Sequence, residues 1–426
     1  MAGSFSGICW QPTAVWIISL TSIALVLIRP RSWPEAVWPV VAASVLVFSG
    51  LVPVATAAQS VGKGTDVYLF LAGMMIISEL ARREGVFDWV AGHAVRASRG
   101  SPSRLFLLIY CVGIVVTTFL SNDATAVVLT PAVQAAVKAA RAEPLPYLLI
   151  CAFIANAASF VLPISNPANL VLYGKGMPPL GRWLLIFTLP SVCSIVATFF
   201  VLRWRANMLM KGAVETNVSG THLSQSGKLT LYGIGFLAAI LMTASGLGMD
   251  LGAPACLAGL LAAAAVSISD HEVPKDIAKE ISWSVIPLVA GLFVIVEAMN
   301  RAGAQRVVVG ALERLETWHP LSAALSSAFG IALVSNLMNN LPSGLIGAAA
   351  MKAAHVAGLL RSALLIGVDL GPNLSITGSL ATILWLIAIR REGQHVGFWR
   401  FLKWGILIMP PALALAVLSL GLVPQP

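Results

Sequence analysis

The stretch that decides the fold is Phe119-Leu120-Ser121-Asn122-Asp123-Ala124-Thr125-Ala126-Val127-Val128-Leu129, in which polar residues interrupt an apolar run of membrane-spanning character. A second interruption lies in the other half of the chain, where Ser335-Asn336 and Asn339-Asn340 follow Ile331-Ala332-Leu333-Val334. Polar residues at membrane depth are costly and mark substrate or ion pathways. We therefore expect one polar tip in each half of the protein.

The composition indicates a membrane protein. Of 426 residues, 58% are apolar and only 11% are charged, which cannot be arranged around a single aqueous core. Long charge-free stretches favour helices over an outer-membrane barrel, whose strands would alternate polar and apolar residues. The net charge of +9 comes mostly from loop Lys and Arg, so it indicates topology, and nothing else supports nucleic-acid binding. The predicted fold class is an all-α membrane protein embedded in the lipid bilayer.

Hydropathy predicts about ten transmembrane helices and two re-entrant hairpins. The spans are expected near 12–29, 36–53, 66–82, 146–174, 181–203, 229–248, 252–270, 282–299, 361–390 and 404–422. The stretches 104–137 and 320–352 carry the polar tips at their middles, so each is expected to enter the membrane and turn back. Irregular backbone at that depth is allowed only where it is buried in protein or lines a cavity.

An internal repeat relates the two halves. Ala72-Gly73, Glu79 and Gly85 recur as Ala290-Gly291, Glu297 and Gly303 at a constant offset of 218, and Ser121-Asn122 is aligned with Ser335-Asn336 at an offset of 214. Beyond each tip a long helix is interrupted, by Pro163–Asn169 in the first half and by Asp369–Ser379 in the second. Each half then holds five spans, one hairpin and one broken helix, and an odd number of spans inverts the second half. The expected repeats are 1–205 and 229–426, joined by a cytoplasmic linker at 206–228.

Loop charges predict the orientation. Most Lys and Arg fall on the cytoplasmic side if both termini lie outside, with the first half carrying most of the asymmetry. The first apolar run lacks a preceding Lys or Arg and a small-residue cleavage site, so we interpret it as a retained helix. The stretches Gly85–Gly100 and Gly303–His319 are expected to be amphipathic helices on opposite membrane faces.

Motifs of soluble enzymes are missing from the sequence. His271-Glu272 is followed by Lys275 where a zinc protease needs a second histidine, and Gly62-Lys63 lacks the earlier glycine of a phosphate-binding loop. We expect no catalytic residue, metal or cofactor. Transport would use an ion gradient or a separate ATPase subunit.

Acidic residues within the apolar runs are candidates for proton coupling. An ionised carboxylate is costly to bury, so Asp123 and Asp369 are expected to be paired, hydrated or protonated. A carboxylate that faces each side in turn can carry a proton across. Alternatively, Asp123 caps a return helix that starts at Ala124. Glu79 and Glu297 are expected to pair with Arg82, Arg83 and Arg301 at the ends of their helices.

Asparagine amides suit recognition of a small hydroxylated solute, because each offers a donor and an acceptor without a charge. The predicted substrate-binding residues are Asn122, Asn166, Asn169, Asn339, Asn340 and Asn373. Supporting roles are predicted for Ser121, Thr125, Ser165, Ser335, Asn336 and Thr377. For any single asparagine the alternative is a capping or interhelical hydrogen bond.

Three segments together resemble the ArsB arsenite efflux permeases of the ion transporter superfamily: Ser121–Pro131, Met338–Pro342, and Asp369–Pro372 with Gly378–Thr382. The resemblance covers nearly the whole chain. It implies an inverted-repeat transporter that exports arsenite or antimonite across the bacterial inner membrane in exchange for protons, assisted in some systems by an ArsA-type ATPase. One departure is Asn373, where relatives often carry a lysine that could balance Asp369.

Alternatives stay open at this stage, because the first segment is also shared by sodium/proton antiporters and anion carriers on the same scaffold. A channel and a membrane enzyme are further alternatives. For arsenite, the five cysteines sit singly on separate segments, so we expect hydrogen bonds to neutral As(OH)3 rather than thiolate binding. The six asparagines would hold the hydroxyls, with Asp123 and Asp369 as proton sites.

Overall fold

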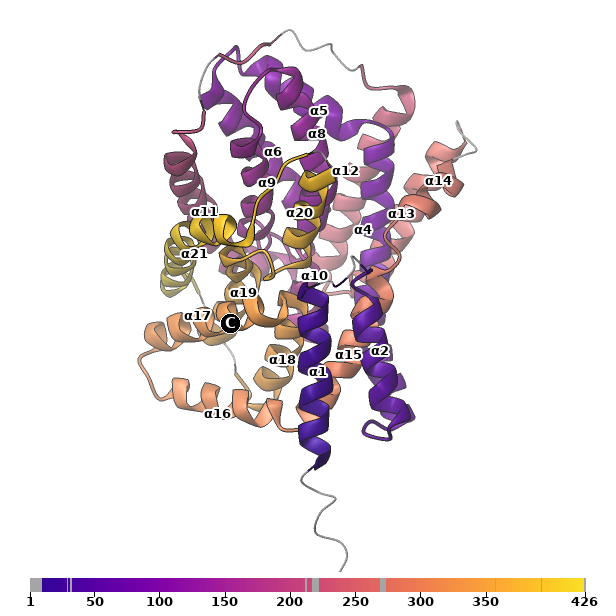
Figure 1. The fold of residues 1–426 in the computed structure, drawn as a ribbon, viewed down its shortest axis with the longest axis vertical. Coiled ribbons are helices and arrows are strands. Elements are labelled where there is room, and N and C mark those ends of the chain that lie inside the picture. Colours follow the sequence, from indigo (N-terminus) through magenta and orange to yellow (C-terminus); the bar gives the residue numbers. More distant parts are fainter. Residues whose placement is uncertain are drawn as a thin grey trace, which may run out of the picture.

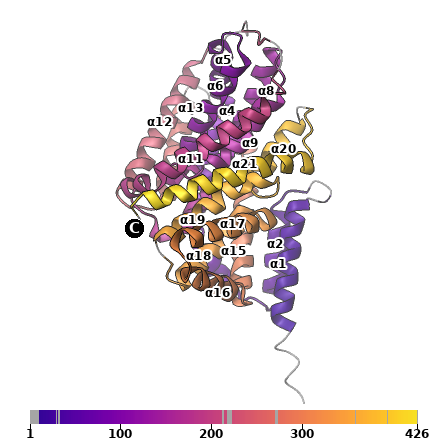
Figure 2. The ribbon, with the colours of Figure 1, turned by 90° about the vertical axis from the view of Figure 1, so that its left-hand side faces the viewer.

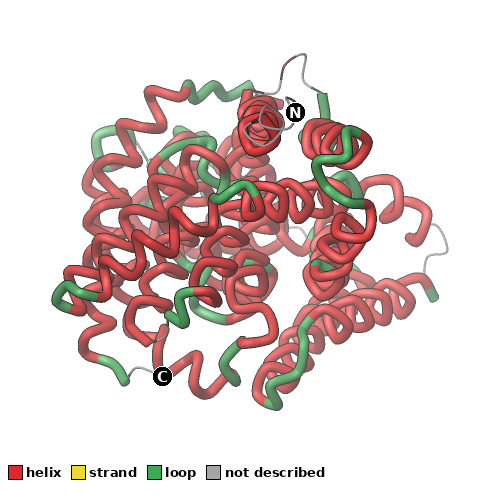
Figure 3. The backbone as a smooth tube through the Cα atoms, turned by 90° about the horizontal axis from the view of Figure 1, so that it is seen from below, coloured by secondary structure: helices red, strands yellow, loops and turns green. Residues whose placement is uncertain are grey.

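The computed structural model describes residues 10–28, 30, 33–210, 213–216, 222–268, 273–356, 358–391 and 393–424. Across these ranges the regular structure is entirely helical, as the tube in Figure 3 shows. Five helices are long and apolar enough to cross a membrane: α6 (Pro102–Leu120), α11 (Leu180–Ala206), α12 (Gln225–Gly246), α17 (Pro320–Met338) and α21 (Phe398–Ser419), which η6 (Leu420–Leu422) extends. The predicted all-α membrane fold is confirmed.

The other predicted spans coincide with further helices, and two of these spans are interrupted. The further helices are α1 (Trp10–Ile28), α2 (Val37–Phe48), α4 (Thr65–Arg83), α9 (Leu145–Ala157), α10 (Pro167–Tyr173), α13 (Gly252–Ser267), α15 (Val285–Arg301), α19 (Gly358–Leu370) and α20 (Leu380–Arg391). Residue 29 and residues 269–270, at the ends of two predicted spans, lie outside the described residues, as do residues 211–212 and 217–221 of the predicted linker.

Two helices were not predicted, because each is too short and too polar to register as a span. Helix α3 (Val54–Lys63) precedes α4 and meets it at a 47° bend. Helix α14 (Val273–Glu280) lies against the end of α4, where Arg83 pairs with Asp276 at 3.1 Å and Arg82 with Glu280 at 3.7 Å. Ion pairs thus fasten α14 to α4.

The two amphipathic helices lie at opposite ends of the molecule. Figures 1 and 2 show α5 (Val86–Ala97) at one end of the long axis and α16 (Ala304–Glu316) at the other, with α10 near the middle in Figure 1. Each helix starts after a glycine in the left-handed region, Gly85 at φ 68° and Gly303 at φ 104°. These two glycines are the pair that the internal repeat aligns. The inverted repeat stays a prediction, and this arrangement supports it.

The helix bounds correct the alignment of the two tips. Helix α6 starts at Pro102 and ends at Leu120, and α17 starts at Pro320 and ends at Met338, so both ends keep the offset that relates Gly85 to Gly303. The second turn is therefore at Asn339, and alignment of Ser121-Asn122 with Ser335-Asn336 was wrong. Ser335 and Asn336 lie within α17, about one turn before the tip. Matching residue letters misled here, because the equivalent feature is the turn conformation.

Close packing holds the second broken helix in place. A Cβ atom on Gly405 of α21 would strike the carbonyl oxygen of Leu374 and lie 2.6 Å from that of Asn373. The Phe153 and Phe401 rings stack with centroids 5.1 Å apart, and Trp385 Nε1 donates to the Leu148 carbonyl at 2.8 Å. Such contacts fix the interrupted backbone against α9 and α21.

Candidate functional site

The two hairpin turns form the first part of the site. Ser121 has φ 101° and ψ 160°, and Asn339 has φ 78° and ψ 154°. Residues other than glycine rarely adopt this backbone region, and such strain concentrates at functional sites. Each strained residue caps the arm that follows: Ser121 Oγ accepts from the Ala124 N–H and Asn339 Oδ1 from the Leu341 N–H, both at 3.4 Å.

The first return arm starts at Asn122, which is earlier than the start at Ala124 required if Asp123 were its cap. It comprises α7 (Asn122–Ala124), the π-helix η2 (Thr125–Leu129) and α8 (Thr130–Ala139). Because the arm begins at Asn122 and Ser121 caps it, the interpretation of Asp123 as the cap was wrong. Asp123 lies in the first turn, with its carboxylate available for another role. The second return arm is α18 (Asn340–Ala353).

The two broken helices form the second part of the site. In the first, Asn166 Oδ1 accepts from the Ala168 N–H at 3.0 Å and so caps α10. In the second, the chain passes through η5 (Gly371–Leu374), and Ser379 Oγ accepts from the Ala381 N–H at 3.1 Å to cap α20. Both caps bond the second residue after the capping one. Four helix starts are thereby fixed by polar side chains.

These four helix starts meet at one small cavity. Its lining is Leu71, Asn122, Asp123, Asn166, Pro167, Val285, Asn340, Leu341, Ser379 and Leu380. Each half of the chain thus contributes its hairpin tip and the second part of its broken helix. Apolar residues of α4 and α15 complete the wall.

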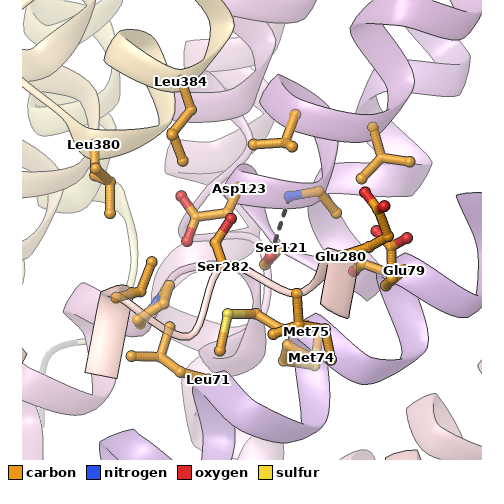
Figure 4. A pocket seen from close by; sticks show the side chains of 17 residues that line it. Leu71, Met74, Met75, Glu79, Ser121, Asp123, Glu280, Ser282, Leu380 and Leu384 are labelled. Atoms are coloured by element: carbon orange, nitrogen blue, oxygen red, sulfur yellow. Dashed lines mark hydrogen bonds between the residues drawn. The ribbon is translucent and has the colours of Figure 1, made fainter. Parts of the chain in front are cut away.

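A wider pocket, which we call the vestibule, adjoins this cavity and shares five lining residues with it: Leu71, Asp123, Pro167, Val285 and Leu380. Figure 4 shows the Asp123 carboxylate close to Ser282 and Leu384, with Glu79 and Glu280 farther along the pocket. The Glu280 side chain is 63% exposed, so the vestibule reaches the surface at the C-terminal end of α4. Asp123 therefore lies at the boundary between the cavity and the vestibule.

On another side, the space next to the cavity is narrow and mostly apolar. Leu341 and Leu380 separate it from the cavity, and its further lining includes Ile23, Val26, Leu288, Leu292 and Met338. The connection to the surface that the structure shows thus runs through the vestibule.

Asp123 is a half-buried carboxylate without a protein partner. Among the described residues it forms no hydrogen bond or ion pair, and no Lys, Arg or His lines the cavity or the vestibule. It is therefore free to exchange a proton with solvent in the vestibule or to contact a ligand.

Asp369 is instead fully buried and doubly bonded. Ser159 Oγ donates to its Oδ2 at 2.8 Å, and Asn166 Nδ2 donates to its Oδ1 at 2.9 Å. It does not line the cavity, but Asn166 does. Asp369 thus contacts the site only through Asn166, whose amide joins the two broken helices.

The structure divides the six predicted asparagines into three groups. Asn122 and Asn340 line the cavity with side chains that bond to no described residue, and Asn122 Oδ1 is buried without a partner. Asn166 lines the cavity with its amide already bonded, and Asn339 caps α18 beside it.

The other two asparagines of that set hold backbone away from the cavity. Asn169 Nδ2 donates to the Ser159 carbonyl at 2.9 Å, which closes the first helix break. Asn373 Nδ2 donates to the Phe153 carbonyl at 2.9 Å, and its Oδ1 accepts from Asn156 at 3.0 Å. Neither side chain lines the cavity, so the interhelical alternative describes both.

Most of the predicted supporting residues form hydrogen bonds between a hairpin and the interrupted part of a broken helix. Asn336 donates to the Gly371 carbonyl at 2.8 Å and accepts from Ser375 at 2.7 Å, and Thr377 donates to the Asn336 carbonyl at 2.8 Å. In the first half Ser165 donates to the Thr118 carbonyl at 3.0 Å, and Thr125 bonds Thr117 across the hairpin at 2.8 Å. Ser335 Oγ is buried without a partner.

Two further predictions concern the outer acids and the cysteines. Glu79 accepts from Arg82 Nε at 3.0 Å and Glu297 from Arg301 Nε at 3.1 Å, as predicted, whereas Arg83 pairs with Asp276. None of the described cysteines, Cys111, Cys151, Cys193 and Cys256, lines the cavity or the vestibule. Cys9 lies outside the described residues.

Three polar residues of the site were missed: Ser159, Ser379 and Asn156. Ser159 bonds Asp369, Ser379 caps α20 at the cavity, and Asn156 bonds both Asn373 and Thr382. Ser379 could have been found, because a serine directly before an apolar run is a typical helix cap. Ser159 and Asn156 gave no local pattern, since their partners lie in the other half of the chain.

A helical membrane protein in which half-helices from two hairpins and two broken helices meet at a polar cavity is a transporter by its architecture. The profile of the citrate transporter family, CitMHS, matches residues 7–368, and the chain belongs to that family. It is a membrane transporter and not an enzyme.

Similar proteins agree with this class. The arsenical pump membrane protein of Escherichia coli (strain K12) is 27% identical over 432 residues, which cover 95% of this chain and 97% of the relative. That of Yersinia enterocolitica is 26% identical, covering 82% and 84%. The resemblance to arsenite permeases expected from the sequence is confirmed.

Among solved structures, the YdaH transporter of Alcanivorax borkumensis superimposes with a TM-score of 0.55 at 14% identity, covering 86% of this chain and 87% of that one. MtrF of Neisseria gonorrhoeae gives 0.50 at 12% identity, covering 84% and 81%. At such identities the likeness shows the fold alone.

Proposed function

We propose that this chain exports arsenite, as neutral As(OH)3, and antimonite from the cytoplasm in exchange for protons. The observation that carries the proposal is the cavity itself. Unbonded amides of Asn122 and Asn340 face it from the two hairpin tips, and the unpaired Asp123 carboxylate stands at its mouth. Amides can donate to and accept from arsenite hydroxyls, and a carboxylate can alternate between bound proton and bound substrate.

The orientation predicted from the loop charges supports export. The vestibule reaches the surface beside Arg82 and Arg83, on the side where the positive-inside rule places the cytoplasm. The structure would then be the state that loads arsenite from the cytoplasm. Exchange by alternating access requires the narrow apolar space beside Leu341 and Leu380 to open while the vestibule closes.

Two proton sites are proposed, with different accessibility. Asp123 exchanges protons through the vestibule, whereas Asp369 is reached only by rearrangement of Asn166 or Ser159. Asp369 therefore acts as a second site whose state depends on the joint between the broken helices. As part of the same proposal, the protein lies in the bacterial inner membrane with both termini outside the cytoplasm. An ArsA-type ATPase is a further proposed partner.

The names of the relatives support the substrate, since the E. coli and Yersinia proteins are arsenical pumps. Weak hydrogen bonding without thiols also suits a transporter, which must release what it binds. The second candidate is an anion carrier or sodium/proton antiporter on the same scaffold, and the citrate transporter family favours the anion carrier.

Arsenite sensitivity of a host lacking its own pump tests the proposal. Expression of this chain should restore growth on arsenite and lower the cellular arsenite content, and an Asp123→Asn variant expressed to the same level should not. Unchanged sensitivity, combined with sodium- or citrate-dependent transport by the purified protein, would favour the second candidate.

A further inference from the structure

Three half-helices that are long enough to carry a helix dipole start at the cavity. They are the first return arm from Asn122 to Ala139, α18 and α20. The N–H groups of Asn122, Asp123, Asn340 and Leu380 have no hydrogen-bond partner among the described residues. The N-terminus of a helix carries a partial positive charge, so these starts make the cavity electropositive.

The cavity also contains a polar group that lacks a partner. Asn122 is 2% exposed, lines the cavity, and has a side-chain oxygen without any hydrogen bond. Because this oxygen faces the cavity, it supports a ligand site at the junction of the capped helices. Because Oδ1 of an amide only accepts hydrogen bonds, a bound solute could satisfy it by donating from a hydroxyl.

Helix starts of this kind bind anions in many proteins. The cavity nevertheless holds an anionic group already, the carboxylate of Asp123, which no Lys, Arg or His on the lining balances. Asp369 cannot act in the same way, because Ser159 and Asn166 occupy its oxygens and it lies outside the lining. Asp123 is thus the one negative charge among the described residues that line the cavity.

We propose that Asp123 determines the substrate specificity of this site. Its carboxylate occupies the position that a bound anion would otherwise take at the N-termini of these helices. Oxyanions and carboxylates are thereby repelled, and a neutral hydroxylated solute is admitted. This inference rests on the proposed function, because it concerns the same cavity. It explains how a chain of the citrate transporter family would accept arsenous acid.

Formate binding to the purified full-length protein tests the inference. Formate is a free carboxylate that matches the side-chain group deleted in Asp123→Ala. The variant is titrated with sodium formate at constant sodium concentration, using gluconate as the replacing anion. The thermal unfolding midpoint and titration calorimetry report binding. Asp123→Ala should bind formate at least about tenfold more tightly than the wild type does, from several helix dipoles acting together.

Glu143→Ala is the matched control, because it removes one negative charge from an exposed loop, and it should behave like the wild type. If Asp123→Ala is not monodisperse, Asp123→Ser, which also removes the carboxylate and leaves space for formate, replaces it with the same expectation. Formate binding by both variants no tighter than by the wild type overturns the inference. Arsenite transport by the wild type is measured separately, so that its absence refutes the proposed function without touching the formate result.

Discussion

Replacing Asn166 by alanine removes two hydrogen bonds, of which one joins the two broken helices and the other caps α10. The amide nitrogen donates to Asp369 at 2.9 Å and the amide oxygen caps α10 by accepting from Ala168 at 3.0 Å. Loss of a hydrogen bond to a carboxylate costs about 1.5–3 kcal/mol, and loss of a cap about 1 kcal/mol. Asn166→Ala should therefore lower the free energy of unfolding by about 3 kcal/mol.

A double-mutant cycle with Asp369→Ala separates the two bonds. Asn166 and Asp369 should show a coupling energy of about 1.5–2 kcal/mol, because only the bond between them is shared. Asn169→Ala is the matched control: its equally buried amide bonds the Ser159 carbonyl and not Asp369, so its coupling to Asp369, which runs through Ser159, should be smaller than that of Asn166.

The assay is reversible denaturation of the purified protein in mixed detergent micelles, followed by tryptophan fluorescence. A coupling energy near zero for the Asn166–Asp369 pair, or one no larger than that of the Asn169 control, would refute the claim that this hydrogen bond joins the two broken helices. In that case Asp369 would have to be satisfied in another way, and its link to the cavity would be lost.

Three further predictions follow from particular contacts. Gly405→Ala should destabilise the protein by about 2 kcal/mol in the same assay, because its Cβ would strike the Leu374 carbonyl, whereas Gly330→Ala, with nothing within 4 Å, should not; equal effects would contradict the packing. Asn122→Ala and Asn340→Ala should each weaken arsenite binding about tenfold in calorimetric titrations, and the exposed Asn207→Ala should leave it unchanged. Replacing all five cysteines by alanine should leave arsenite export largely intact, and its loss at normal expression would refute the thiol-free site.

Much of the fold could be predicted because apolar length and turn residues are local features. Residues 146–174 and 361–390 were recognised as interrupted helices from Pro163 and from Gly371-Pro372, which disfavour continuous helix where they occur. Gly85 and Gly303 likewise marked the two turns at which the amphipathic helices begin. The short polar helices α3 and α14 escaped, since neither satisfies a span-length criterion.

The site was predictable by residue type and only partly by position. Asn122, Asn340 and Asp123 were found because polar residues stand out in an apolar run. Asn169 and Asn373 stand out equally, yet they satisfy carbonyls at the helix breaks. A buried amide is needed wherever irregular backbone crosses the membrane, so sequence alone cannot separate that task from ligand binding.

Counter-transport in reconstituted vesicles tests the central claim most directly. Purified protein is incorporated into liposomes with an acidic interior, and uptake of radiolabelled arsenite is followed while protons leave. The wild type should accumulate arsenite above its equilibrium level until an uncoupler collapses the gradient, and Asp123→Asn should reach only equilibrium. Accumulation by Asp123→Asn equal to that of the wild type, or uptake that follows a sodium gradient instead, would contradict proton exchange through Asp123.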